Sequence, residues 1–236
     1  MTSPIVAVFA AALALTGCDA LPGRPRPDAV ELAPTEVMAF ETLYARNCAG
    51  CHGQTGRLGA ARALNDPVYL AVVPPERMRQ VIATGVPGTA QPAFVLSAGG
   101  PLTDQQIDVL AQGIRERWQR PAAVADDRVP PYEDGRAPDR AAGDADRGLA
   151  VFATACARCH GEDGRGSPKG GSVADPSYLA LVSDQHLRTT VIAGRSDLGM
   201  PDWRLGGTAA PLTPQQVSDV VAWLVAQRRP VPGRLP

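Results

Sequence analysis

Two copies of the pattern Cys-x-x-Cys-His constrain this chain more than any other feature. They occupy residues 48–52 and 156–160. Two intervening residues place both thiols on one turn of the chain, and the next residue presents an imidazole beside them. This spacing is typical of covalent haem attachment, in which the thiols bind the porphyrin vinyl groups and the histidine binds the iron. The sequence therefore predicts two haem c groups, held by Cys48, Cys51 and His52 in the first motif and by Cys156, Cys159 and His160 in the second.

Two other uses of a Cys-x-x-Cys pair were weighed. A thioredoxin-like redox pair is expected in a βαβ context, and a structural zinc site usually draws ligands from a second pair. A single four-thiolate zinc site built from both pairs would leave His52 and His160 without a role. Haem attachment is the interpretation that uses every residue of both motifs.

The sequence around the motifs is also repeated. The two motifs are 108 residues apart, and three further segments of the first half recur in the second half at offsets of 109 or 110 residues: 65–71 with 174–180, 81–83 with 191–193, and 101–106 with 211–216. The offset drifts little, so the whole unit is duplicated with small loop insertions. We therefore expect two homologous domains, each with one haem.

Composition places the boundaries of these domains. Residues 121–143 are rich in Pro and Ala and show no apolar periodicity, which is typical of a linker. The expected haem domains are residues 34–120 and 144–229, followed by a C-terminal tail at 230–236. A domain of about 85 residues has a marginal core by itself, and haem would supply apolar bulk.

Each domain is expected to contain a helix before the motif, a middle helix and a C-terminal helix. The predicted ranges are 36–47, 75–84 and a helix opening at Thr103 in the first domain, and 146–155, 184–193 and a helix opening at Thr213 in the second. Threonine is a favourable N-cap, and Pro214 suits a first helical turn. No segment alternates like a strand, so the fold class is all-α.

This helix order resembles the class I cytochrome c family, in tandem, over residues 34–120 and 144–229. In that family a small residue of the first helix lets an aromatic residue of the last helix pack across it. Gly148 and Trp223 match this pattern in the second domain, whereas Phe40 and Gly113 stand at these positions in the first. We expect the large and small partners to be exchanged across the same contact, the alternative being two unrelated differences.

The sixth position of each iron needs a separate assignment. Cytochromes c usually fill it with Met, and Met200, in a Gly-Met-Pro loop, resembles that ligand in the second domain. The repeat places Gln91 at the same position of the first domain, so that iron is bound by Gln91, by water or by no sixth ligand. Met78 and Met38 lie on helices and are expected to be poorly placed as ligands.

Two further observations bear on function. The remaining histidine, His186, aligns with Arg77 on the middle helix and is expected to face solvent. The chain has 23 basic and 24 acidic residues and a net charge of −1, without a basic run. We therefore expect no nucleic acid partner.

The N-terminus resembles the signal of a bacterial lipoprotein. An apolar run over residues 5–15, too short to span a bilayer, leads into Leu15-Thr16-Gly17-Cys18. The resemblance implies a cleaved signal peptide at 1–17, a lipidated Cys18 and a tether over 18–33. It places the protein on the periplasmic side of the inner membrane, held there by its lipid anchor. The alternative is the signal of a soluble exported protein, in which Cys18 is incidental.

The expected function is electron transfer by a membrane-anchored, di-haem c-type cytochrome without substrate chemistry or catalytic residues of its own. Its expected redox partners are a quinol-oxidising complex or a dehydrogenase as donor and an oxidase or reductase as acceptor. Two alternatives use an open first haem. One is a peroxidase-like or thiosulfate dehydrogenase-like enzyme, and the other is a ligand sensor.

Overall fold

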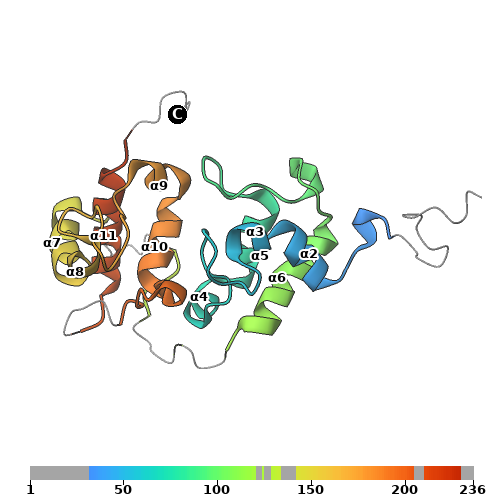
Figure 1. The fold of residues 1–236 in the computed structure, drawn as a ribbon, viewed down its shortest axis with the longest axis horizontal. Helices are drawn as coiled ribbons and strands as arrows, with labels where there is room; N and C mark the ends of the chain where they lie inside the picture. Colours follow the sequence, from blue (N-terminus) through green and yellow to red (C-terminus); the bar gives the residue numbers. More distant parts are fainter. Residues whose placement is uncertain (1–31, 121–123, 125–128, 134–141, 205–209, 230–236) are drawn as a thin grey trace, which may run out of the picture. The chain divides into compact units, whose positions relative to one another are not determined.

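The computed structural model describes residues 32–120, 124, 129–133, 142–204 and 210–229 (Figure 1). It divides into two units, Met1–Glu36 and Val37–Pro236. The described part of the first unit contains one 3-10 helix, η1 (Pro34–Glu36). The second unit contains two helical halves that follow each other along the chain.

The two halves consist of the same series of elements. The described residues of the first half form α2 (Phe40–Asn47), α3 (Ala49–His52), α4 (Pro67–Val72), α5 (Pro75–Thr84), η2 (Leu96–Ala98) and α6 (Asp104–Trp118). Those of the second half form α7 (Ala145–Ala155), α8 (Ala157–His160), α9 (Pro176–Leu181), α10 (Asp184–Ala193), η3 (Ser196–Leu198) and α11 (Pro214–Ala226). The described residues contain isolated β-bridges and no β-strand. The predicted all-α class and the repeat are confirmed.

The long helices begin and end close to their predicted bounds, with one exception. The side chains of Thr103 and Thr213 cap α6 and α11, and each forms a capping box with a glutamine three residues later. The prediction that the first helix starts at residue 36 is wrong, because α2 begins at Phe40. The segment before it is held by a different bond, in which the buried Gln106 side chain of α6 donates to the Val37 carbonyl at 2.9 Å.

Two short helices, α4 and α9, were not predicted. Both begin at an Asp-Pro pair inside the repeated segment. Asp66 and Asp175 each accept two backbone N–H groups of the first turn, and Pro67 and Pro176 occupy the first helical position. A proline there sacrifices no intrahelical hydrogen bond. The two Asp-Pro pairs are therefore a signal for the start of a helix that the sequence contains.

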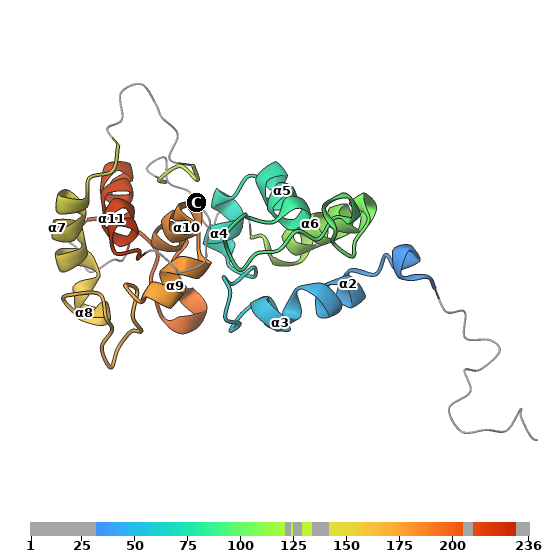
Figure 2. The ribbon, with the colours of Figure 1, turned by 90° about the horizontal axis from the view of Figure 1, so that it is seen from above.

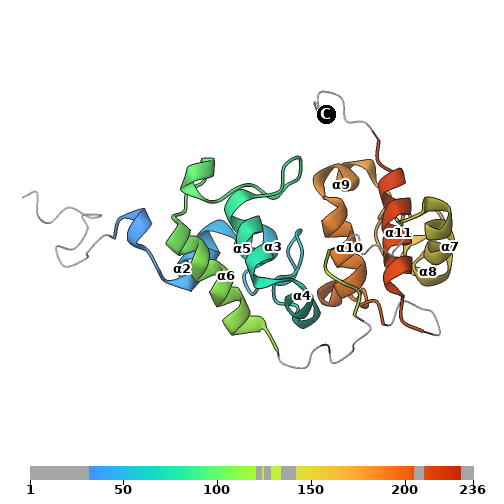
Figure 3. The same cartoon turned by 180° about the vertical axis from the view of Figure 1, so that it is seen from behind.

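The first and last helices of each half pack against each other, α2 on α6 and α7 on α11 (Figures 1 and 3). Phe40 provides one side of the first contact. A Cβ atom built on Gly113 would lie 2.3 Å from the Cδ2 atom of Phe40. In the second half a Cβ atom on Gly148 would lie 2.8 Å from the Cβ atom of Trp223. The predicted exchange of large and small partners is confirmed.

A second tryptophan completes the first domain. Trp118, at the end of α6, lies edge-on to the Tyr44 ring with centroids 5.3 Å apart. It also covers Gly56 in the loop after the first motif, where a Cβ atom would lie 2.7 Å from the indole ring. Trp223 covers the equivalent Gly164 at 3.1 Å. In each half, a tryptophan of the last helix thus covers a glycine of the loop after the motif. The two tryptophans stand at different positions of their helices.

The two halves contact each other through α4 and α10 (Figure 2). The described part of the predicted linker also binds both halves. Its Pro131 and Tyr132 carbonyl oxygens accept hydrogen bonds from Arg188 at 3.1 Å and Gln185 at 2.7 Å on α10. Glu133 of the same stretch forms an ion pair at 2.5 Å with Arg77 on α5. This stretch is therefore part of the contact between the halves.

Candidate haem sites

Each Cys-x-x-Cys-His motif forms a tight turn at the end of the first helix of its half. Cys48 ends α2 and opens α3, and Cys156 does the same between α7 and α8. All four motif cysteines are free thiols. Burial raises the pKa of the Cys48 thiol to about 12 and that of the Cys156 thiol to about 11. Both thiols are therefore neutral at neutral pH.

The two motif histidines have the same orientation. His52 places its Nδ1 atom 2.7 Å from the Arg62 carbonyl oxygen, and His160 places its Nδ1 atom 2.7 Å from the Gly171 carbonyl oxygen. A carbonyl oxygen can only accept, so Nδ1 carries the proton and the Nε2 lone pair is available to a metal. Burial also lowers the pKa of His52, which favours the neutral ring that iron requires.

The loop before the last helix places Gln91 and Met200 at equivalent backbone positions. The carbonyl of Gln91 accepts the N–H of Val86 at 3.0 Å, and the carbonyl of Met200 accepts the N–H of Arg195 at 3.0 Å. The Gln91 amide donates to the neighbouring Pro92 carbonyl at 3.3 Å. The loop therefore has the same backbone hydrogen bond in both halves, but it carries Gln91 in the first half and Met200 in the second.

The other methionines and the last histidine have different surroundings. Met78 is buried in the first core, as expected, and Met38 is 41% exposed just before α2. The prediction that His186 faces solvent is wrong, because this residue is half-buried on α10, which packs against the first half. Burial, together with the charges of Arg62 and Arg195, lowers the pKa of His186 to about 3.

The residues present fit a haem. In the second half the indole Nε1 of Trp203 is buried, the residue is 1% exposed, and the described residues give that atom no hydrogen-bond partner. A buried N–H without an acceptor is costly, and a haem carboxylate is an acceptor of the required kind. Phe94, which stands three residues after Gln91 as Trp203 stands after Met200, has no such group.

The four cysteines belong to two separate sites. Among the residues that the structure describes, no three His, Cys, Asp or Glu side chains form a group that could hold one metal ion.

Cys18 lies outside the described residues. No helix in the described ranges is both long and apolar enough to cross a membrane.

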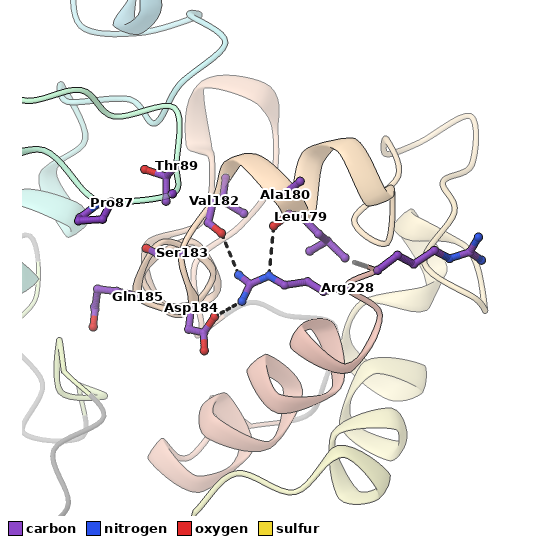
Figure 4. Close-up of a pocket in the computed structure, with 11 residues that line it drawn as sticks. Pro87, Thr89, Leu179, Ala180, Val182, Ser183, Asp184, Gln185 and Arg228 are labelled. Carbon is purple, nitrogen blue, oxygen red and sulfur yellow. Dashed lines mark hydrogen bonds and ion pairs between the residues drawn. The ribbon is translucent and has the colours of Figure 1, made fainter. Parts of the chain in front are cut away.

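A cavity of about 570 Å³ lies between the loop at Pro87–Thr89 and the turn from α9 to α10 (Figure 4). None of the predicted haem ligands lines it. The Arg228 guanidinium crosses one wall and donates to the carbonyls of Leu179 at 3.1 Å and Val182 at 2.8 Å, with Asp184 as its ion-pair partner. This arginine is therefore fully engaged in joining α9, α10 and the end of α11.

Comparison with known proteins gives matches over both halves. The family described as cytochrome c oxidase, cbb3-type, subunit III matches residues 35–112 and 143–224. The cbb3-type cytochrome c oxidase subunit FixP of Bradyrhizobium sp. (strain ORS 278) is 31% identical over 169 residues, which are 69% of this chain and 53% of that protein. The FixP subunit of Azorhizobium caulinodans is 28% identical over 195 residues, 79% of this chain and 58% of that protein.

The chain thus spans little more than half the length of these relatives. Among solved structures, a chain of the Kuenenia stuttgartiensis reducing HAO-like protein complex aligns with a TM-score of 0.46 and 16% identity, over 85% of this chain and 100% of that chain. This likeness is too low to bear on function.

Proposed function

Because the chain belongs to the family of cbb3-type cytochrome c oxidase subunit III, and binds two haem c groups in tandem cytochrome c domains, we propose that it relays electrons between respiratory redox partners at the periplasmic face of the bacterial inner membrane. The observation that carries the proposal is the repeated histidine geometry. His52 and His160 each donate from Nδ1 to a backbone carbonyl and leave Nε2 for iron.

The haem supplies one-electron redox chemistry, and the chain supplies ligands, orientation and exclusion of water. The Nδ1 bonds fix the tautomer and the angle of each imidazole. The buried contacts of α2 with α6 and of α7 with α11 keep the ends of the first helices, which carry the motifs, in place. No side chain with an acid–base role is needed for this function.

We propose an oxidase of the cbb3 type as the electron acceptor. The relatives that support this assignment are named as subunits of that oxidase. The donor is a quinol-oxidising complex or a dehydrogenase. The test is to reduce the purified holoprotein, count the electrons that it takes up, and follow its reoxidation by a purified cbb3-type oxidase. Two electrons per chain and rapid reoxidation are expected, and reduced protein that the oxidase leaves unoxidised would contradict the proposal.

We also propose that Cys18 carries the membrane anchor. The support is the sequence Leu15-Thr16-Gly17-Cys18 after an apolar run too short to span a bilayer. A Cys18→Ser variant should appear in the soluble fraction after cell disruption, with both haems attached. A Thr16→Ser variant is the matched control and should stay with the membranes. Retention of Cys18→Ser in the membrane pellet through a salt wash would refute the anchor.

A second candidate function rests on Gln91. An iron without a strong sixth ligand could bind a small molecule, as in a di-haem enzyme or a sensor. The binding of carbon monoxide to the reduced protein distinguishes these functions from that of a simple carrier.

A further inference from the structure

Arg62 holds the first motif histidine through its backbone and reaches the other half of the molecule through its side chain. Its carbonyl oxygen accepts the hydrogen bond from His52. The same task in the second half belongs to Gly171, which has no side chain. The guanidinium of Arg62 is therefore an addition that the histidine geometry itself does not require.

The Arg62 side chain is buried, with the residue 6% exposed. It donates to the Thr190 hydroxyl on α10, and its guanidinium lies 4.9 Å from the centre of the Tyr69 ring. The Thr190 hydroxyl in turn donates to the His186 carbonyl at 2.8 Å, so its lone pairs are free to accept from Arg62. The loop that orients His52 is thus bonded directly to a helix of the second domain.

A second contact runs in the opposite direction, from the loop that carries Met200 in the second half to the first half. The Arg195 backbone pairs with Met200 in both directions at 3.0 Å. Its guanidinium donates to the Gly59 carbonyl at 3.1 Å and pairs with Asp197. The side chain of Asp197, which is buried, also accepts the backbone N–H of Leu58 at 2.9 Å. The supports of His52 and Met200 therefore meet in one hydrogen-bonded contact between the domains.

The charge of Arg62 has a consequence of its own. Among the described residues no carboxylate forms an ion pair with it. The carboxylate of Asp66 acts on Arg62 only through its charge, while its oxygens accept hydrogen bonds from the first turn of α4 and from the Ser196 hydroxyl. Ferric haem carries one more positive charge than ferrous haem. A buried cation beside the histidine loop therefore favours the ferrous state and raises the potential of the first haem.

We infer that Arg62 is a positioning residue for electron transfer between the two haems: its backbone orients His52, its side chain fixes the same loop to α10, and its charge raises the potential of the first haem. The inference rests on the proposed electron-transfer function. Because transfer between fixed centres depends on their separation and on their difference in potential, both properties should change when this residue changes.

The experiment uses the full-length holoprotein with Arg62→Met, Arg62→Lys, Thr190→Val and the Arg62→Met/Thr190→Val double variant. Redox titration gives the potentials of the two haems, and flash photoreduction by a flavin gives the rate of transfer between them. Arg46→Met is the matched control, because Arg46 is an exposed arginine of the same domain on α2.

Arg62→Met should lower the potential of the first haem, leave that of the second unchanged, and slow the transfer. Arg62→Lys should retain the potential but transfer more slowly, since an ammonium does not reproduce the planar guanidinium contact. Thr190→Val keeps the charge, so it should slow the transfer at an unchanged potential. The double variant should be no slower than Arg62→Met, because the two residues act through one bond.

Wild-type potentials and wild-type rates in Arg62→Met would overturn the inference. If this variant fails to retain haem, Thr190→Val and Arg62→Lys decide, and wild-type rates in both would overturn it equally. Failure of the proposed function would give a different result. In the wild type, electrons would still pass between the two haems but would not reach an oxidase.

Discussion

Met200 and Gln91, the proposed sixth ligands, occupy equivalent positions of two equivalent loops and would offer iron different donors. A thioether is a soft ligand that stabilises ferrous haem and raises its potential, whereas an amide oxygen is hard and weak. Axial ligand identity moves haem potentials over roughly 0.8 V. Two nearly identical loops are therefore enough to separate the two haems in potential.

The first prediction concerns Met200. Met200→Ala should abolish the methionine–iron charge-transfer absorption of the whole oxidised protein, since Met78 is buried in the first core and Met38 lies outside the loop. Absorption spectroscopy of the oxidised holoprotein checks this. Met78→Leu is the control and should keep the band. A band that survives in Met200→Ala would show that another residue binds the iron.

Leu58 is the non-glycine residue that the structure places at a positive φ, 63°, and it is 71% exposed. A left-handed conformation costs such a residue about 1–2 kcal/mol. Leu58→Gly should therefore raise the free energy of unfolding by about 1 kcal/mol, since little packing is lost and the backbone N–H still reaches Asp197. Chemical denaturation of the holoprotein measures the change.

A matched control has the opposite sign. Leu149 is 47% exposed in the interior of α7. Leu149→Gly should destabilise the protein by about 1 kcal/mol, because glycine is unfavourable in a helix. Equal losses in both variants would mean that the strain at Leu58 is not released.

The presence of two haem c groups could be predicted at this scale because the attachment motif is local in sequence, and the individual site residues stay a prediction. Cys48, Cys51 and His52 lie within five residues, and any chain that attaches haem in this way needs that spacing. The buried surroundings of Arg62 and His186 could not be predicted, because both depend on contacts between domains that are distant in sequence. The expected exposure of His186 failed for this reason.

At the level of helices, the repeat predicted most elements because each carries its own boundary signals. The threonine caps of α6 and α11 were identified, whereas the Asp-Pro openings of α4 and α9 were overlooked although they are equally local. The start of α2 is different. A hydrogen bond from Gln106, nearly seventy residues away, holds Val37 just before that boundary, and no local sequence pattern predicts this bond.

The contact between Phe40 and Gly113 gives a prediction about helix packing. A Cβ atom at Gly113 would overlap the Phe40 ring, so Gly113→Ala should destabilise the first domain by about 1–3 kcal/mol. Gly113→Trp should do the same by itself, and adding Phe40→Gly should recover much of the loss by reproducing the arrangement of Gly148 and Trp223. Denaturant unfolding of the wild type, Phe40→Gly, Gly113→Trp and the double variant measures this coupling.

Gly50→Ala is the control for the helix-packing prediction. Gly50 is a helical glycine where an added Cβ atom would meet nothing within 4 Å, and the second motif carries Arg158 at this position. It should be neutral or slightly stabilising. Additive losses for Phe40→Gly and Gly113→Trp would show that the two positions do not compensate each other.

For the whole molecule, the two domains and their duplicated origin could be predicted, and their mutual contact could not. Residues 121–143 have the composition of a linker, yet the Pro131 and Tyr132 carbonyls are bonded to α10. Every residue has a backbone carbonyl, so the amino-acid composition cannot predict which carbonyls accept hydrogen bonds from another domain. The contact also bears on the proposed function, because it joins the loop that orients His52 to the loop that carries Met200.

The difference between the two iron sites leads to the last prediction. Carbon monoxide binds ferrous haem only where the sixth position is open or weakly held, and Gln91 competes for that position less than Met200 does. The reduced holoprotein should therefore take up one equivalent of carbon monoxide per chain, at the first haem. Optical titration measures the stoichiometry, and the spectrum of the Met200 site reports whether the second haem stays unchanged.

Gln91→Met should suppress this uptake and raise the potential of the first haem, because the loop of the first half already places residue 91 where Met200 stands in the second. Gln91→Ala is the matched control, which should keep or increase the uptake because it removes the competing amide. If the wild-type protein takes up no carbon monoxide at neutral pH, both irons hold two strong ligands. The enzyme and sensor functions would then lose their structural basis, and electron transfer alone would account for the duplicated domain.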